Sequence, residues 1–323
     1  MKLLFGKPGE NPDLELHALL GNIDKNIAFT NIQPEIEEAT KEVIKLIGKD
    51  AYEEIYNVYR QATIADDEAE LIKSVRYPIA LDGYRHFAIS SDVVHGNNGR
   101  KIRVDEHNKV PFEWMIDRDN EAQERRYYKA LDNMLDYLDE FSATWMASEE
   151  YKATQKYYVR KTSDFEDVYP IESRLLFLRL LPGFRRAEKK HIIPIITPAV
   201  NSDFKTRLQT GGLFNDDEKD LLELLKEASI YSALAWGMRV LRITLFPQGI
   251  LQSFVTERMT TQGRKPSEKL ETELAAQELE KRAREVLTEL QTIVSPPTQT
   301  DIDSLCPTNP NFAFDDDDGF VSM

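Results

Sequence analysis

The chain carries an internal repeat, and this feature limits its fold more than any other. When the sequence is shifted by 154 positions, Tyr77 falls on Tyr231 and Gly83 falls on Gly237. A fixed shift that aligns whole segments indicates a duplicated structural unit. Chance agreement between amphipathic helices is the alternative, because such helices share their apolar spacing. Further pairs are Leu71–Leu225, Arg85–Arg239 and Ile89–Ile243 at the same shift, Leu131–Val286, Leu135–Leu290 and Leu138–Ile293 at a shift of 155, and Ala39–Ala187, Ile44–Ile192 and Ile47–Ile195 at a shift of 148.

Each copy is predicted to contain a short helix, a second helix and a long helix. Apolar residues with helical spacing begin near residue 33 in the first copy, and Gly48 is expected to cap that helix. In the second copy, Asn215 is a favourable N-cap for the middle helix. A glycine inside a helix costs about 1 kcal/mol relative to alanine. Gly83 and Gly237 are therefore expected to mark places where helices pack closely.

A β-hairpin is predicted between the second and the long helix of each copy. In the first copy, Asn98-Gly99 is a strong hairpin turn signal, and residues 91–105 read as the hairpin. In the second copy, residues 247–249 form a turn signal that precedes a strand-like run. An isolated two-stranded hairpin is only marginally stable in water. Both hairpins, of about twenty residues, are thus expected to be arms that pair with another chain or enter a groove.

The predicted fold class is mainly α, with two tandem helical modules that each carry an inserted β-hairpin arm. The acidic run Asp315–Asp318 near the chain end is interpreted either as a solubilising end or as a docking segment. The predicted domains are an N-terminal arm at 1–32, helical module 1 at 33–143, linking helices at 144–183, helical module 2 at 184–294 and an acidic C-terminal tail at 295–323.

Composition narrows the classes of partner. The net charge is −15, so the chain as a whole has no basic footprint for nucleic acid. An acidic surface either keeps the protein soluble or repels DNA and lets it slide past. Cys306 is the single cysteine, which rules out an intrachain disulfide and fits a reducing compartment. No run of about 18 apolar residues occurs, so no membrane span is expected.

No catalytic, cofactor or metal site is predicted, and the protein is expected not to be an enzyme. The histidines do not stand at metal-ligand spacing, and no phosphate-binding loop or G-x-S-x-G motif occurs. Carboxylate pairs such as Asp216-Asp217 are expected on solvated helix faces. The basic pairs Arg125-Arg126 and Arg185-Arg186 are expected to form salt bridges, with contact to DNA or a partner as the alternative.

Candidate interface residues lie in the predicted arms, at the start of the first long helix and in the tail. Core packing is the default for the three tryptophans, and Trp114 is the best candidate for an interface anchor. The predicted interface residues are Val93, Val94, Asn98, Ile102, Val104, Trp114, Phe246, Ile250, Phe254, Phe312, Phe314 and Phe320.

One stretch of the chain resembles a known family. The pattern Ala39-x-x-x-Val43-Ile44-x-x-Ile47-Gly48-x-x-x-Tyr52, the hairpin arm and the helix start Phe112-Glu113-Trp114 are similar to the head–tail connector (head-completion adaptor) family of tailed bacteriophages. The resemblance covers residues 33–141. The second copy departs from it, since Ile196 replaces Gly48 and Val200 replaces Tyr52.

The resemblance implies a homo-oligomeric ring beneath the portal at the capsid vertex. Its partners would be the portal protein and tail or other connector proteins, and DNA would pass through the ring without sequence-specific contact. The protein would reside in the virion, and in the host cytoplasm during assembly. Two alternatives stay open, namely another non-enzymatic scaffold, tail or ring protein, and an enzyme or binding module whose site the sequence does not reveal.

Overall fold

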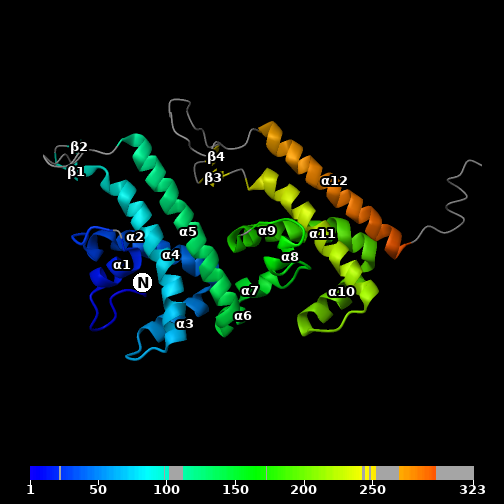
Figure 1. Cartoon of the computed structure of the whole chain (residues 1–323), viewed down its shortest axis with the longest axis horizontal. Helices are drawn as coiled ribbons and strands as arrows, with labels where there is room; N and C mark the ends of the chain where they lie inside the picture. The colour runs from blue at the N-terminus through cyan, green and yellow to red at the C-terminus, as the bar shows by residue number, and fades with distance from the viewer. Residues whose placement is uncertain are drawn as a thin grey trace, which may run out of the picture.

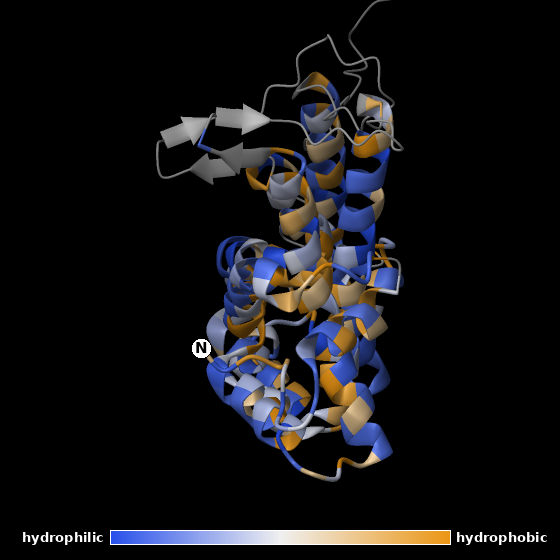
Figure 2. Cartoon of the chain, turned by 90° about the vertical axis from the view of Figure 1, so that its left-hand side faces the viewer, coloured by the Kyte–Doolittle hydropathy of each residue, from blue (hydrophilic) through white to orange (hydrophobic). Residues whose placement is uncertain are grey.

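Helices make up most of the structure, which is a computed structural model describing residues 1–21, 23–97, 99–101, 112–171, 173–241, 244–246, 249–251 and 269–295. The expectation of a mainly α protein is confirmed. Figure 1 shows two long helix pairs, α4–α5 and α11–α12, with α9 between them. Figure 2 shows hydrophilic and hydrophobic residues on the same helices, as expected when each helix turns one side toward a core.

The first half builds its core from residues between Leu4 and Trp145. Apolar side chains of α2 meet α4, and α4 in turn packs on α5. Gly48, at φ +85°, ends α2 as predicted, and its N–H donates to the Ile44 carbonyl. The helices are α1 (Pro12–Leu20), α2 (Phe29–Ile47), α3 (Lys49–Tyr59), α4 (Asp66–Ser91), α5 (Glu113–Phe141), α6 (Ala143–Ala147) and α7 (Glu149–Thr154).

The second half has its own core, from Tyr158 to Leu290. Here α9 packs on α11, and α11 packs on α12. Asn215 caps α11 as predicted, because its Oδ1 accepts from the Glu218 N–H at 2.8 Å. The helical elements are α8 (Ser163–Glu166), α9 (Arg174–Ala187), the π-helical turn η1 (Glu188–Ile192), α10 (Ile193–Thr210), α11 (Asp216–Val240) and α12 (Lys269–Val294).

Both predicted glycine contacts lie between the first and the middle helix of their half. A Cβ atom on Gly83 would lie 2.5 Å from Ile36 Cδ1 of α2. A Cβ atom on Gly237 would lie 2.5 Å from Leu180 Cδ2 of α9. These distances are too short for any real Cβ contact, so each glycine permits a close approach of two helices. The prediction of tight packing at both glycines is confirmed.

Short antiparallel strand pairs follow the middle helix of each half. Strand β1 (Val94–Gly96) pairs with β2 (Gly99–Lys101), and β3 (Thr244–Phe246) pairs with β4 (Gly249–Leu251). Each described strand has three residues. The expectation of arms of about twenty residues is therefore not supported by the described strands, and residues 102–111 and 252–268 lie outside the described part.

The predicted domain boundaries need two corrections. Residues 1–32 are not an arm, because Leu4 and Leu16 are fully buried in the first core. Glu15 of α1 also accepts from Tyr59 Oη at 2.7 Å and from Arg76 Nη2 at 2.8 Å. Helix α9, which the prediction placed among linking helices, supplies Phe177 and Leu180 to the second core. It is therefore the first helix of that half, as α2 is of the other.

The helical stretch from 174 to 210 is divided into three elements. It starts as α9, passes through the π-helical turn and continues as α10. Glu188 in this turn is 3% exposed, forms an ion pair with Lys205, and accepts from the Tyr158 N–H at 2.8 Å. A second break occurs at Thr197, whose φ is +69° just before Pro198. The first break is accompanied by the contacts of Glu188, whereas the second follows from Pro198, which disfavours helical backbone at the residue before it.

A basic groove as candidate functional site

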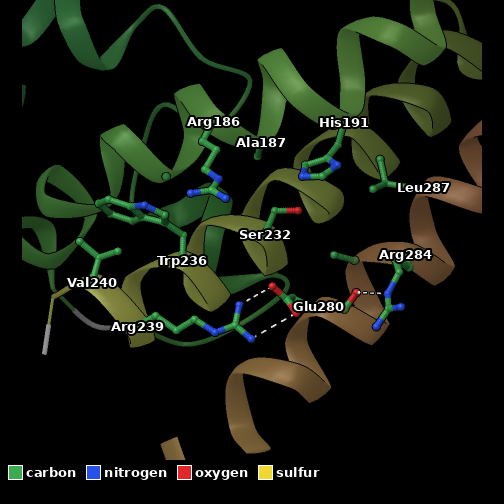
Figure 3. A pocket seen from close by; sticks show the side chains of 12 residues that line it. Arg186, Ala187, His191, Ser232, Trp236, Arg239, Val240, Glu280, Arg284 and Leu287 are labelled. Carbon is green, nitrogen blue, oxygen red and sulfur yellow. Dashed lines mark hydrogen bonds and ion pairs between the residues drawn. The ribbon is translucent and has the colours of Figure 1, made fainter. Parts of the chain in front are cut away.

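A groove of about 330 Å³ opens between α9, α11 and α12, and we call it the basic groove (Figure 3). Gly183 and Gly237 bring α9 and α11 together beneath it. All of its lining residues belong to the second half. The side chains are Arg186, Ala187 and His191 from α9 and η1, Ser232, Trp236, Arg239 and Val240 from α11, and Glu280, Ala283, Arg284 and Leu287 from α12.

One arginine of the groove is fully paired. Arg239 Nη2 lies 2.8 Å from Glu273 Oε1, and Arg239 also forms an ion pair with Glu280 (Figure 3). The hydrogen bonds from Arg239 lower the pKa of Glu280. This pair ties α11 to α12 and closes one end of the groove, so Arg239 and Glu280 nearly cancel each other's charge.

The other cations of the groove are not neutralised. Within the described residues, no carboxylate forms a salt bridge with Arg186 or Arg284. Arg284 only donates through Nε to the Glu280 backbone carbonyl at 3.3 Å. Burial, followed by the nearby Lys190 and Arg186 charges, lowers the pKa of His191, which favours its neutral form. The groove thus carries the unpaired charges of Arg186 and Arg284, and the exposed residues Arg185, Lys189 and Lys190 flank its lining residues in the sequence.

This positive patch corrects part of the sequence prediction. Arg125 does form the expected salt bridge, 2.9 Å from Glu121, and Arg126 donates to Tyr77 Oη at 3.1 Å. Arg185 and Arg186 have no salt-bridge partner among the described residues. With Lys189 and Lys190, four cations without a salt bridge among the described residues stand within six positions of a chain whose net charge is −15. The run Arg185-Arg186-Ala187-Glu188-Lys189-Lys190-His191 was the signal that could have revealed the groove.

The groove suits binding better than covalent chemistry. Ser232 and His191 both line it, but no hydrogen bond joins them, so the pair is not arranged as a nucleophile with its base. In the part of the chain that the structure describes, no group of three or more His, Cys, Asp or Glu could hold a metal ion. Two arginines beside an indole can instead receive a carboxylate and an aromatic ring together.

A second groove occupies the corresponding place in the first half. It lies between α2, α4 and α5, and Arg85 stands where Arg239 stands in the other half. Arg85 Nη2 pairs with Asp82 Oδ1 at 2.7 Å, and its guanidinium lies 5.1 Å from the Tyr127 ring centroid. Leu175 and Arg179 of α9 also line this groove. The second half therefore borders the first groove, whereas no first-half residue lines the basic groove.

The predicted interface residues are placed only in part. Trp114 lies near the start of α5 and is 49% exposed, next to exposed Phe112 and Met115, which the sequence prediction did not include. Trp145 is fully buried, as expected by default. Val93 is half-buried after α4, Val94 lies in β1, Phe246 in β3 and Ile250 in β4, whereas Asn98, Ile102, Val104, Phe254, Phe312, Phe314 and Phe320 lie outside the described residues.

Comparison with known proteins gives one match. A family model described as a family of unknown function, DUF6712, matches residues 43–155. The match runs from α2 to just past the end of α7, so it lies within the first half and does not reach the basic groove. The chain matches no curated protein and no solved structure. None of the described helices has the length and apolar character needed to cross a membrane.

Proposed function

We propose that the two halves are copies of one helical module, and that the protein is a non-enzymatic structural protein that assembles into a ring. The common order of elements supports the duplication: first helix, middle helix, strand pair and long helix. Burial supports it as well. At a shift of 148, the buried residues Phe29, Ile32, Ile36 and Ala39 of α2 align with buried Phe177, Leu180, Phe184 and Ala187 of α9.

The observation that carries the ring proposal is the contact between the halves. Helix α9, the first helix of the second half, packs on α5, the long helix of the first half. Arg174 Nε lies 2.9 Å from Asp139 Oδ2, and the Leu175 N–H donates to Asp132 Oδ1 at 2.8 Å. Similar modules thus meet through different surfaces, which is a heterologous contact. Repetition of such a contact generates a closed ring or an open filament.

The resemblance to head–tail connectors suggests which ring this is. We propose a connector or adaptor beneath the portal of a tailed-phage virion, with the portal and tail proteins as partners. The acidic composition suits a channel through which DNA passes without being held. Another scaffold or tail-ring protein would share the same architecture, and a portal-binding assay separates the two. The strand pairs are proposed to be the bases of arms that contact these partners.

Exposed apolar side chains at one end of α5 support a contact surface there. Phe112, Trp114 and Met115 are 70%, 49% and 46% exposed. Contiguous exposed apolar residues on a soluble protein commonly mark an interaction site. This end of α5 follows the first strand pair in the chain, so the proposed arm and the apolar cluster belong to one region.

Native mass spectrometry and negative-stain imaging test the proposal. We expect a closed ring that binds a portal protein. Deletion of residues 93–104 should leave the helical circular dichroism largely unchanged but abolish assembly. Trp114→Ala should weaken assembly, whereas Phe141→Ala, which removes another exposed aromatic of α5, serves as the matched control. A persistent monomer, or normal assembly of the deletion variant, would contradict the proposal.

A further inference from the structure

We propose that the basic groove is a docking site for the chain's own acidic C-terminal segment, residues 312–320. This inference does not depend on the proposed ring. It assigns a function to the groove through three properties, namely charge, apolar surface and distance along the chain.

Charge complementarity is the first property. Arg186 and Arg284 line the groove without a carboxylate partner among the described residues. The segment carries four consecutive carboxylates, Asp315–Asp318. Carboxylate–guanidinium hydrogen bonds are among the strongest in proteins, and the fork of an arginine can bind both oxygens. The groove is locally basic and the segment is densely acidic, so their charges are complementary.

The apolar surface of the groove is the second property. Trp236 is partly exposed and faces the groove together with Val240 and Leu287 (Figure 3). In the segment, Phe312 and Phe314 directly precede the aspartates. A phenylalanine beside an indole and an arginine gains both ring contact and cation–π attraction. A peptide that joins aromatic and acidic residues thus matches both kinds of lining side chain.

The distance along the chain between the groove and the segment is the third property. Helix α12 lines the groove at Arg284, and the described chain ends at Ser295, about 16 Å farther along the helix at 1.5 Å per residue. Residues 296–311 connect Ser295 to the segment, and a flexible chain of that length would have a root-mean-square span of about 20–24 Å, at about 5–6 Å times the square root of its length. A linker that matches the distance gives the highest effective concentration. Docking within one chain is therefore favoured over docking on another copy.

The corresponding groove of the first half does not offer the same site. Of its two arginines, Arg85 is paired with Asp82 and only Arg179 has no salt bridge among the described residues, while Glu42 also lines this groove. An acidic segment would meet carboxylates there. The two grooves thus share a position, but only the second is lined by two arginines without a carboxylate partner among the described residues, and the segment is expected to select it.

The single native cysteine allows a test in the full chain. Cys306 lies within the linker, and a dansyl-type label on it accepts energy from nearby tryptophan. We expect energy transfer that falls by more than half in Trp236→Phe. The double variant Arg186→Glu with Arg284→Glu should lower the transfer. The remaining transfer should equal that of the labelled parent chain in about 1 M salt, where charges are screened beyond about 3 Å. Arg118→Glu with Arg125→Glu on α5 makes the same change in charge and should leave the transfer unchanged.

A second variant and a mixing experiment keep the test decisive. If the groove variant loses helical circular dichroism, substitution of Asp315–Asp318 by asparagine probes the same contact from the segment and leaves the groove residues unchanged. Labelled chains co-assembled with excess unlabelled Trp236→Phe chains should keep their transfer, because donor and acceptor belong to one chain. Loss of transfer in that mixture would place the segment on another copy and overturn the proposal. Equal transfer in the groove and control variants would overturn it as well.

Discussion

Arg174 and Asp139 form an ion pair across the junction of the two halves, with 2.9 Å between Nε and Oδ2 and an arginine side chain that is only 2% exposed. Asp139 also accepts from Trp145 Nε1 at 2.7 Å. The terminal nitrogens of Arg174 have no hydrogen-bond partner among the described residues, and its guanidinium lies 4.6 Å from the Phe177 ring centroid. Asp139 is thus the main group that compensates for burying this charge.

Loss of Asp139 should therefore be more harmful than loss of Arg174. Asp139→Ala leaves a buried cation unpaired, and we expect a loss of about 3 kcal/mol in the free energy of unfolding. Arg174→Met retains an apolar chain over Phe177 and leaves only a partly exposed carboxylate, so about 1 kcal/mol is expected. Urea unfolding followed by circular dichroism measures both values. Equal losses would show that the junction does not depend on this charge.

The two close glycine contacts should respond differently to alanine. At Gly83 the added Cβ meets Ile36 Cδ1 and also its backbone nitrogen at 3.2 Å, so α2 itself must move. We expect Gly83→Ala to cost about 1–2 kcal/mol despite its better helix propensity. At Gly237 only the end of the Leu180 side chain is closer than 3.6 Å. Gly237→Ala should therefore stay within about 1 kcal/mol of the parent, and thermal unfolding would detect a reversed order.

The packing of the N-terminal segment can be tested at Glu15. Its carboxylate is 7% exposed and accepts from Arg76, Tyr59 and the Gly6 N–H. Glu15→Ala should lower the free energy of unfolding by about 2–3 kcal/mol and expose residues before α2 to proteases. Glu38→Ala breaks the exposed pair with Lys41 on α2 and should change stability by less than about 0.5 kcal/mol. Similar proteolysis of both variants would mean that Glu15 does not hold the segment in place.

The contributions of Glu188 and Glu280 to stability should depend on pH in opposite directions. Burial raises the pKa of Glu188 above its ordinary value of 4.5, although Lys205 opposes this effect. Its contribution to stability is therefore complete below pH 4.5 and is lost as the pH rises through the raised pKa. The hydrogen bond from Arg239 lowers the pKa of Glu280, so the contribution of Glu280 is present above pH 4.5 and is lost as the pH falls.

Glutamine variants isolate these two effects. We expect the stability of the parent relative to Glu188→Gln to decrease with rising pH, and its stability relative to Glu280→Gln to increase. Urea unfolding at a series of pH values on both sides of 4.5 gives both differences. If both stability differences change with pH in the same direction, the environment described for Glu188 or the one described for Glu280 is wrong.

The sequence predicted features that depend on local or periodic signals. The Asn215 cap needs only Glu218 three residues later, and the packing role of Gly83 and Gly237 follows from glycine within a helical pattern. Burial of the N-terminal segment was missed because the partners of Glu15 lie at Tyr59 and Arg76, far along the chain.

The π-helical turn and the basic groove were missed for a similar reason. The turn is accompanied by burial of Glu188 against Lys205, a contact between two helical elements. The groove combines side chains from three elements, and no local sequence pattern around Trp236 or Arg284 indicates that these residues line a groove. Helical periodicity reports which side of one helix is apolar, but it does not report which three helices will meet.

Leu178 of α9 packs against both cores. One half cannot melt without removing part of the apolar environment that this side chain needs in the other. The two cores should accordingly share a single cooperative transition, and a calorimetric scan should show one endotherm rather than two. The same coupling means that a force applied to one half of the molecule should be carried into the other half.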